Sequence, residues 1–332
     1  MTAPRDYGIA RCWLIALLIL ISGCGEQAIS EQDNTDSRQD LDAPVAGLSP
    51  SIRPSENPAE NAIRFGVLSI DSAVSVNRRY RPLLDYLQEK TGYAFELIPL
   101  SQESQFSEVE NNNLEFIAHN PLAAVQTQRL YKTEFLVTIS RPKTGTKFSA
   151  AIIVRAQSDV KAIADLKNKK AACVNFKAAA AGCTFQMLHL KQRGFNPFKD
   201  FASFIEIPSQ DNIVLAVLNG TVDVGFIRTG QLEKMQANGL VRSLEDIRIL
   251  EPVDNDFFYP HTTALYPEWT IAALQDTDPE LSDSVRQALL TIPEGHPALE
   301  ASKYSGFVEP VDYSPIRLLI DELSLDRASE AE

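Results

Sequence analysis

Two cysteines near the middle of the chain, Cys173 and Cys183, are the residues whose type and spacing most directly suggest chemistry. Cys173 lies in the apolar stretch KKAACVN, and Cys183 begins the helix-like stretch CTFQMLHLKQR. A strand-to-helix turn can bring the two sulfur atoms together, so an exported protein would pair them in a disulfide. Three alternatives stay open: two unpaired cysteines, one of them an apolar core residue; a thiol of lowered pKa at a helix N-terminus; and a soft-metal site with Met187.

Motifs typical of enzymes and cofactor sites are missing from the sequence. The strings GxSxG, HExxH, GxxxxGK[ST] and GxGxxG do not occur, nor does CxxC. His189, His261 and His296 show no metal-ligand spacing. The sequence therefore predicts a protein that is not an enzyme and that carries no cofactor and no metal.

Composition limits the partners further. The chain has 332 residues, 44% of them hydrophobic and 23% charged, and a formal net charge of −13. Its length is about twice the roughly 150 residues of one domain, which predicts two cores, and its acidity argues against nucleic acid. A local basic cluster of Arg141, Lys143 and Lys147 is more typical of a solvated loop than of a charged cleft. Small ligands and proteins are the expected partners.

The first residues predict export and a lipid anchor. Arg5 and Arg11 precede an apolar run over residues 12–21, which is short for a membrane span. The run ends in ISGC, which resembles the bacterial lipobox, so we expect residues 1–23 to be a signal peptide and Cys24 to carry acyl chains. A non-cleaved membrane anchor is the alternative. Gly25 leaves outer-membrane sorting possible, so we expect a cell-envelope protein whose membrane is undecided.

Residues 24–60 are predicted to be a tether. From residue 25 onward they contain mostly acidic charges, several prolines and no aromatic residue. A segment of this composition cannot bury a core. A flexible chain of this length spans on the order of 35 Å, so we expect it to let the folded body reach a partner while staying anchored.

The rest of the chain alternates strand-like and helix-like segments. An apolar strand at Ile63–Leu68, a helix over 80–90 and a strand over 94–99 form one βαβ unit. Further strands are expected over 114–118, 134–140, 149–154, 170–175, 201–207 and 223–227. This order predicts parallel α/β sheets. In such sheets ligands bind beyond the carboxyl ends of strands, so the loops there are the expected site.

Those loops also carry a family resemblance. FGVLS, RPLLDYLQEKTG, LEFIAHNPLAAV, LAVLNGTVDVGFIRTGQLE and LYPEW follow one another along the chain. In this order they resemble the phosphate/phosphite/phosphonate substrate-binding family of ABC transporters. The FIRTGQLE and LYPEW stretches are similar to the branch that also occurs as the input domain of sensor kinases. The resemblance implies a two-lobed periplasmic-binding-protein fold of class II type, with two hinge crossings and an inter-lobe cleft.

The resemblance also implies binding residues. Where the family has an aromatic contact after a strand, this chain has His119 and Asn120; where the family has a Ser/Thr-rich turn, it has alanines that lead to Gly182. The loss of hydroxyl donors, each worth roughly 0.5–1.5 kcal/mol, argues against tight phosphonate binding. The full set of expected ligand-binding residues is His119, Asn120, Ala180, Ala181, Gly182, Gln210, Asp211, Arg228 and Thr229. The guanidinium of Arg228 suits an oxyanion.

From these features we predict a tethered solute-binding lipoprotein. Residues 61–146 and 252–332 should form lobe 1, and residues 147–251 should form lobe 2. A small anion or zwitterion would bridge the lobes and favour their closed form. In a transport role an ABC permease would recognise the closed form, and in a signalling role a membrane sensor protein would recognise it. A scaffold that binds no small ligand is a third possibility, which the alanine turn keeps open.

Overall fold

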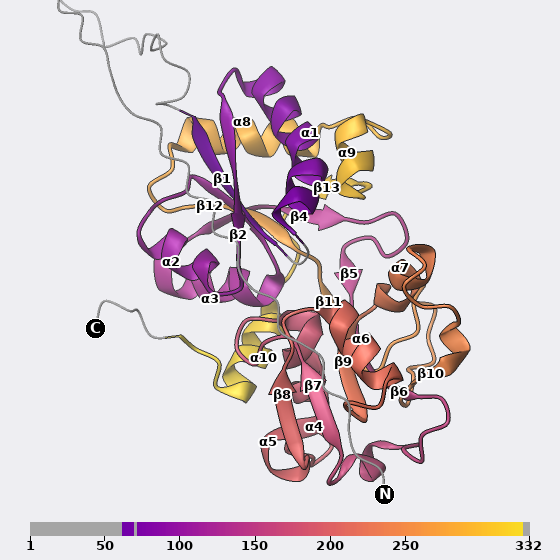
Figure 1. The fold of residues 1–332 in the computed structure, drawn as a ribbon. Coiled ribbons are helices and arrows are strands. Elements are labelled where there is room, and N and C mark those ends of the chain that lie inside the picture. The colour runs from indigo at the N-terminus through magenta and orange to yellow at the C-terminus, as the bar shows by residue number, and fades with distance from the viewer. Residues whose placement is uncertain (1–61, 70–71, 328–332) are drawn as a thin grey trace, which may run out of the picture. The chain divides into compact units, whose positions relative to one another are not determined.

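The computed structural model describes residues 62–69 and 72–327, all of which fall within one compact unit. The expected signal segment (1–23), Cys24 and the expected tether (24–60) lie outside the described residues. Across the part that is described, no helix is long and apolar enough to cross a membrane. Figure 1 shows the described chain as two groups of strands and helices, which we call the first and second lobe by the sheet that each contains.

The first lobe is built on a six-stranded mixed sheet. Its strands lie in the order β13 (Gly306–Val308), β4 (Glu134–Ser140), β12 (Thr270–Ala273), β3 (Phe116–His119), β1 (Ile63–Leu68) and β2 (Phe95–Leu100). β1 pairs in parallel with β2 and β3, whereas β12 pairs antiparallel with both β3 and β4.

The second lobe is built on a five-stranded mixed sheet. Its strands lie in the order β10 (Ile247–Ile249), β6 (Ala150–Arg155), β9 (Val224–Arg228), β7 (Lys170–Cys173) and β8 (Ser203–Glu206). β7 is parallel to β8 and β9, and β6 is antiparallel to β9.

The chain crosses between the lobes twice. It leaves the first sheet after β4, enters the second through β5 (Lys147–Phe148), and returns through β11 (Tyr266–Pro267) to β12. β5 and β11 pair antiparallel, so the two crossings are joined to each other. The fold is therefore a two-lobed α/β fold with two crossings.

The expectation of purely parallel sheets was wrong. A chain that returns to a lobe it has left can complete that lobe's sheet in the opposite direction, as β12 does by inserting between β3 and β4. Most of the strands expected from apolar runs are present, with ends that differ by a few residues. The helix expected over 80–90 begins earlier, because the Ser72 hydroxyl accepts a hydrogen bond from the Ser75 N–H and caps α1 (Ala73–Thr91).

Helices pack on both sheets. Those that belong to the first lobe are α1, α2 (Ser104–Glu110), α3 (Pro121–Tyr131), α8 (Pro279–Leu290) and α9 (Pro297–Ser302). Those of the second lobe are η1 (Ile163–Leu166), η2 (Ala180–Thr184), α4 (Phe185–Lys191), α5 (Pro197–Asp200), α6 (Gln210–Leu218), α7 (Gln231–Ala237) and η3 (Leu244–Asp246). The last helix, α10 (Ser314–Leu323), packs against both α3 and α4 and so contacts both lobes.

Helix α6 lies very close to strand β9, and this contact positions the start of α6 and the end of β9. The approach occurs at Gly225 of β9, where an added Cβ would lie 2.7 Å from Cγ2 of Ile213 and 2.9 Å from Cγ2 of Val217, both on α6. The absence of a side chain at Gly225 therefore lets the N-terminus of α6 lie next to the end of β9, where Arg228 is found.

We predict that Gly225→Ala destabilises the protein. The new methyl group overpacks the α6–β9 interface, which typically costs about 1–3 kcal/mol, and guanidinium unfolding should show that loss. Thr221→Ala, at an exposed position just before β9, is the matched control and should stay within about 0.5 kcal/mol of wild type. Equal stability of the two variants would contradict the packing argument.

Candidate ligand-binding site

Two adjoining cavities lie between the lobes and share two lining residues, Phe148 and Arg228. Phe148 belongs to the crossing strand β5, and Arg228 is the last residue of β9. One cavity has a volume of about 80 Å³ and is called the inner cavity here. The other has a volume of about 710 Å³ and is called the outer cavity. Both lobes contribute residues to each lining.

One turn of the second lobe forms much of the inner cavity wall. Ala179, Ala180, Ala181 and Gly182 all line it, and the helix begins there with the π-helical turn η2 before it continues as α4. A side chain at position 182 would not fit, because its Cβ would lie 2.9 Å from Cγ2 of Val174. The turn presents no hydroxyl group to the cavity, so its polar groups there are backbone N–H groups at the start of a helix.

A disulfide closes the base of this turn. Cys173 ends β7, Cys183 lies in η2, and their sulfur atoms are bonded at 2.04 Å. Both cysteines are fully buried, and the sulfur of Met187 lies 3.6 Å from that of Cys183. Bonded sulfurs are not the thiolates that bind metals. The structure thus forms a closed loop over residues 174–182, part of which lines the inner cavity.

Three predicted residues hold the turn that follows β9. The side-chain oxygen of Gln210 accepts a hydrogen bond of 2.8 Å from the Arg228 N–H. Asp211 accepts a hydrogen bond from the Gln231 side chain, and the Thr229 hydroxyl donates one of 3.1 Å to the Ser149 carbonyl. Gln210 lines the inner cavity, whereas Asp211 and Thr229 line the outer one.

His119 and Asn120, the predicted contacts from the first lobe, differ in their surroundings. Asn120 lines the inner cavity, caps α3 and donates a 3.0 Å hydrogen bond to the Ala178 carbonyl of the second lobe. His119 is fully buried at the end of β3 and lies outside both cavity linings. Burial lowers the pKa of His119 to about 3, so its ring is neutral. Neither ring nitrogen has a partner among the described residues.

The outer cavity concentrates positive charge in an acidic protein. Its basic lining residues are Arg78, Arg79, Arg141, Lys143, Arg228, Lys234 and Lys303. The described lining contains a single carboxylate, that of Asp211. Five of these cations form no ion pair with a described carboxylate, namely Arg78, Arg79, Lys143, Arg228 and Lys303. The same protein carries a net charge of −13.

Arg141 differs from these cations because it is paired. Its Nε lies 2.6 Å from Oε1 of Glu268, whose side chain is completely buried. Arg228 has no such partner in the part of the chain that the structure describes, where its Nε donates to the Thr229 carbonyl at 3.3 Å. Burial, followed by repulsion from Arg141, lowers the pKa of Arg228 to about 10. Arg228 is therefore still charged at neutral pH, but its charge is incompletely solvated.

Several lining residues were not expected from the sequence. Arg79 lies on α1 and Lys303 follows α9, far from the loops that the family resemblance pointed to. The paired arginines in NRRYR were the available signal, but arginines on a helix are commonly solvent-exposed. Arg141 and Lys143, which were expected to be in a solvated loop, line the outer cavity.

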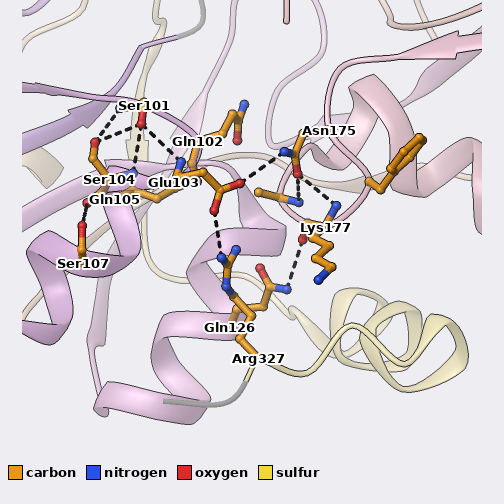
Figure 2. A network of polar contacts seen from close by, with 12 residues as sticks. Ser101, Gln102, Glu103, Ser104, Gln105, Ser107, Gln126, Asn175, Lys177 and Arg327 are labelled. Carbon is orange, nitrogen blue, oxygen red and sulfur yellow. Dashed lines mark hydrogen bonds and ion pairs between the residues drawn. The ribbon is translucent and has the colours of Figure 1, made fainter. Parts of the chain in front are cut away.

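A second set of inter-lobe contacts, which we call the back latch, is shown in Figure 2. Glu103 of the first lobe accepts hydrogen bonds from Asn175 at 3.3 Å and from Arg327 at 2.9 Å. The Gln126 side chain donates to the Lys177 carbonyl of the second lobe at 3.2 Å. It also donates to the Leu325 carbonyl in the C-terminal segment of the first lobe. Figure 1 shows α2, α3 and α10 on one side of the crossings and α7 and α9 on the other. The back latch and the outer cavity therefore lie on different sides of the molecule.

Residues 65–313 match the profile of a family described as ABC transporter, phosphonate, periplasmic substrate-binding protein. The two-lobed fold with a cleft defines the class of periplasmic binding proteins. This chain belongs to the phosphonate-binding family within it.

Individual relatives cover most of the chain. The tetrathionate sensor histidine kinase TtrS of Salmonella typhimurium is 26% identical over 236 residues, which are 69% of this chain and 39% of that protein. The chain therefore spans well under half the length of that relative. PhnD1 of Prochlorococcus marinus, solved with methylphosphonate, has a TM-score of 0.65 and 14% identity over 81% of this chain and all of its own. A phosphonate-transporter binding protein of Pseudomonas aeruginosa, PA3383, has a TM-score of 0.66 and 15% identity over 80% of this chain and 88% of its own.

We predict that removing one latch residue favours a more open arrangement of the lobes. Gln126→Met keeps the buried length of the side chain but removes its hydrogen bond to the Lys177 carbonyl of the second lobe, which contributes about 1 kcal/mol to lobe contact. Small-angle X-ray scattering of the ligand-free protein should show a larger radius of gyration. Gln236→Ala, on the exposed face of α7, is the control and should leave the radius unchanged. An unchanged radius in Gln126→Met would show that the latch does not hold the lobes.

We also predict that Cys173 and Cys183 are oxidised in the exported protein. Denaturing alkylation without reductant, followed by peptide mass mapping, should label neither cysteine. Closing a loop with a sequence separation of 10 should stabilise the fold by about 3 kcal/mol in the chain-entropy model, so the double serine variant should unfold at lower denaturant. Labelling of both thiols in the native protein would instead support the reactive-thiol alternative.

Proposed function

We propose that this protein captures a small anion in the cleft and presents the resulting closed form to a membrane protein. The observation that carries this proposal is the convergence of cations without carboxylate partners on one cavity of a protein with a net charge of −13. Assembling like charges without counter-ions costs free energy unless a ligand supplies the opposite charge. Arg78, Lys143 and Lys303 are exposed to solvent, whereas Arg79 and Arg228 are partly buried, so this cost falls mainly on the latter two.

In this proposal Arg228 is the main anchor of the ligand. It lies where the two cavities meet, and its guanidinium can donate two parallel hydrogen bonds to one oxyanion. Gln210 fixes the backbone that carries Arg228, and the alanine turn ending at Gly182 offers backbone N–H groups. Asp211 lines the outer cavity, where it would accept the ammonium group of a zwitterion.

Closure would occur about the paired crossings β5 and β11. We assign residues 61–146 and 252–332 to lobe 1 and residues 147–251 to lobe 2, and the membership of strands in the two sheets supports this assignment. A ligand that contacts both lobes binds the closed form more tightly and shifts the population toward it by that difference in affinity. The closed form is then the species that the membrane partner recognises.

Two kinds of partner suit this role. Membership of a transporter-linked family favours an ABC permease. Similarity to the input region of TtrS favours a membrane sensor protein, and it adds tetrathionate to the anions worth testing. In either role the body would work outside the cytoplasm, held to the membrane by the acylated Cys24 and the tether predicted from the sequence. Genes for a permease and an ATPase beside this one would support transport.

Simple phosphonates are not expected to be the physiological ligand. The alanine turn itself offers no hydroxyl donor, so Ser69 supplies the one Ser/Thr hydroxyl of the described lining, and no carboxylate is present there to accept a hydrogen bond from a partly protonated phosphonate. We expect a dissociation constant for methylphosphonate above about 1 μM, which corresponds to roughly −8 kcal/mol.

We predict that Arg228→Ala weakens anion binding by about tenfold or more, since hydrogen bonds to charged groups contribute about 1.5–3 kcal/mol. Thermal melts and titration calorimetry with sulfate, methanesulfonate, methylphosphonate, thiosulfate and tetrathionate measure the effect. Arg242→Ala, an exposed arginine of the second lobe outside both cavities, should bind like wild type. No binding of any anion by the wild type would leave the scaffold alternative; unchanged affinity in Arg228→Ala would remove Arg228 from the site.

A further inference from the structure

The inner and outer cavities differ in size and chemistry but meet at Arg228 and Phe148. From this we infer that the ligand is an extended dianion, with one charged group at each end and an uncharged middle. The inference rests on the proposed anion-binding function and names the class of ligand. It assigns one end to the inner cavity, the middle to the junction and the other end to the outer cavity.

The inner cavity accepts one compact group. Its volume of about 80 Å³ is far smaller than the about 710 Å³ of the outer cavity. Within the described lining, Arg228 is the sole charged residue, and the alanine turn adds apolar surface and backbone N–H groups. Neutral polar side chains complete the lining, namely those of Ser69, Gln102, Asn120 and Gln210. Such a wall suits one compact ionised group, such as a sulfonate.

The outer cavity is too large and too positive for the same group to satisfy. Its volume is about 710 Å³. Arg79 has a buried Nε with no hydrogen-bond partner among the described residues, and its guanidinium donates to the Ser302 carbonyl at 3.2 Å. Lys303 lies on the same side of the cleft and forms no ion pair with a described carboxylate. A single anion held in the inner cavity leaves these first-lobe cations uncompensated, whereas a second negative group among them compensates both.

The junction between the cavities explains why the middle of the ligand is uncharged. Phe148 is buried, its ring stacks edge-on with Phe185, and it presents apolar surface to both cavities. A strongly hydrated spacer would lose water against this ring, and Arg228, the one charged residue of the junction, is already engaged by the group at the inner end. A short chain of carbon or sulfur atoms avoids this loss of water.

This arrangement also gives the ligand a contact with each lobe. The inner end contacts the alanine turn of the second lobe, and the outer end reaches Arg79 on α1 and Lys303 after α9 in the first lobe. Both lobes also line the inner cavity, so one charged group already touches each lobe, and the second charged end adds the first-lobe cations to that contact.

The test compares ligands that have two separated charged ends with ligands that have a single charged centre. The probes are 1,2-ethanedisulfonate and tetrathionate, each with two sulfonate ends; methanesulfonate, with one; and sulfate, a compact dianion. By calorimetry at fixed ionic strength, the two-ended probes should bind at least about tenfold more tightly than methanesulfonate and sulfate. Equal affinities across the panel would overturn the inference while leaving anion binding intact, whereas failure of every anion to bind would overturn the proposed function itself.

Variants of the outer end make the test independent of ligand size. Arg79→Gln should lower the affinity ratio of ethanedisulfonate to methanesulfonate at least about fivefold. Because Arg79 is half-buried, Lys303→Asn provides a second variant at an exposed position whose φ of 61° asparagine tolerates, and it should lower the ratio in the same direction. Arg242→Ala should leave the ratio unchanged. A ratio equal to wild type in both outer-cavity variants would show that no second charged end binds there.

Discussion

The buried ion pair between Arg141 and Glu268 joins the two chain crossings on which the cleft depends. Arg141 precedes β5 and Glu268 follows β11, and the Glu268 N–H also donates to the Thr146 carbonyl. The Glu268 carbonyl accepts a hydrogen bond from Tyr313, at the start of α10. A fully buried carboxylate is tolerated only when it is paired, and loss of one partner typically costs about 3–5 kcal/mol. The pair thus fixes the crossings, the last helix and one wall of the outer cavity together.

The loop over residues 174–182 connects the inner cavity to the back latch, where the two lobes are in contact. One part of it, from Ala179 to Gly182, lines the inner cavity, while Asn175 and Lys177 take part in the back latch. The Cys173–Cys183 disulfide ties the two ends of the loop to each other. Because both parts belong to one covalently closed loop, a group that enters the inner cavity acts on the same segment that holds the lobes together on the other side.

The sequence predicts individual strands and helices well, but it does not predict which residues far apart in the chain come together in the fold. The limits of β4 follow from an apolar run with a clear end, and the two-lobed fold follows from motifs in a fixed order. β12 has only four residues, TIAA, and its place between β3 and β4 is set by pairing with strands far away in sequence. Likewise, nothing near Arg79 or Lys303 in the sequence indicates that tertiary packing brings both into the lining with Arg228.

The overall charge limits where an anion can be held. A net charge of −13 repels anions at a distance, but at physiological salt charges are screened beyond about 8 Å. Inside the cleft, the nearest charges are cations held in partly desolvated surroundings, where their interactions are stronger than in water. The acidic surface and the basic cleft therefore act together, because weak nonspecific binding of anions elsewhere on the protein is disfavoured. A ligand must enter the cleft to be attracted, and two separated charges draw on cations from both lobes where one charge reaches mainly Arg228.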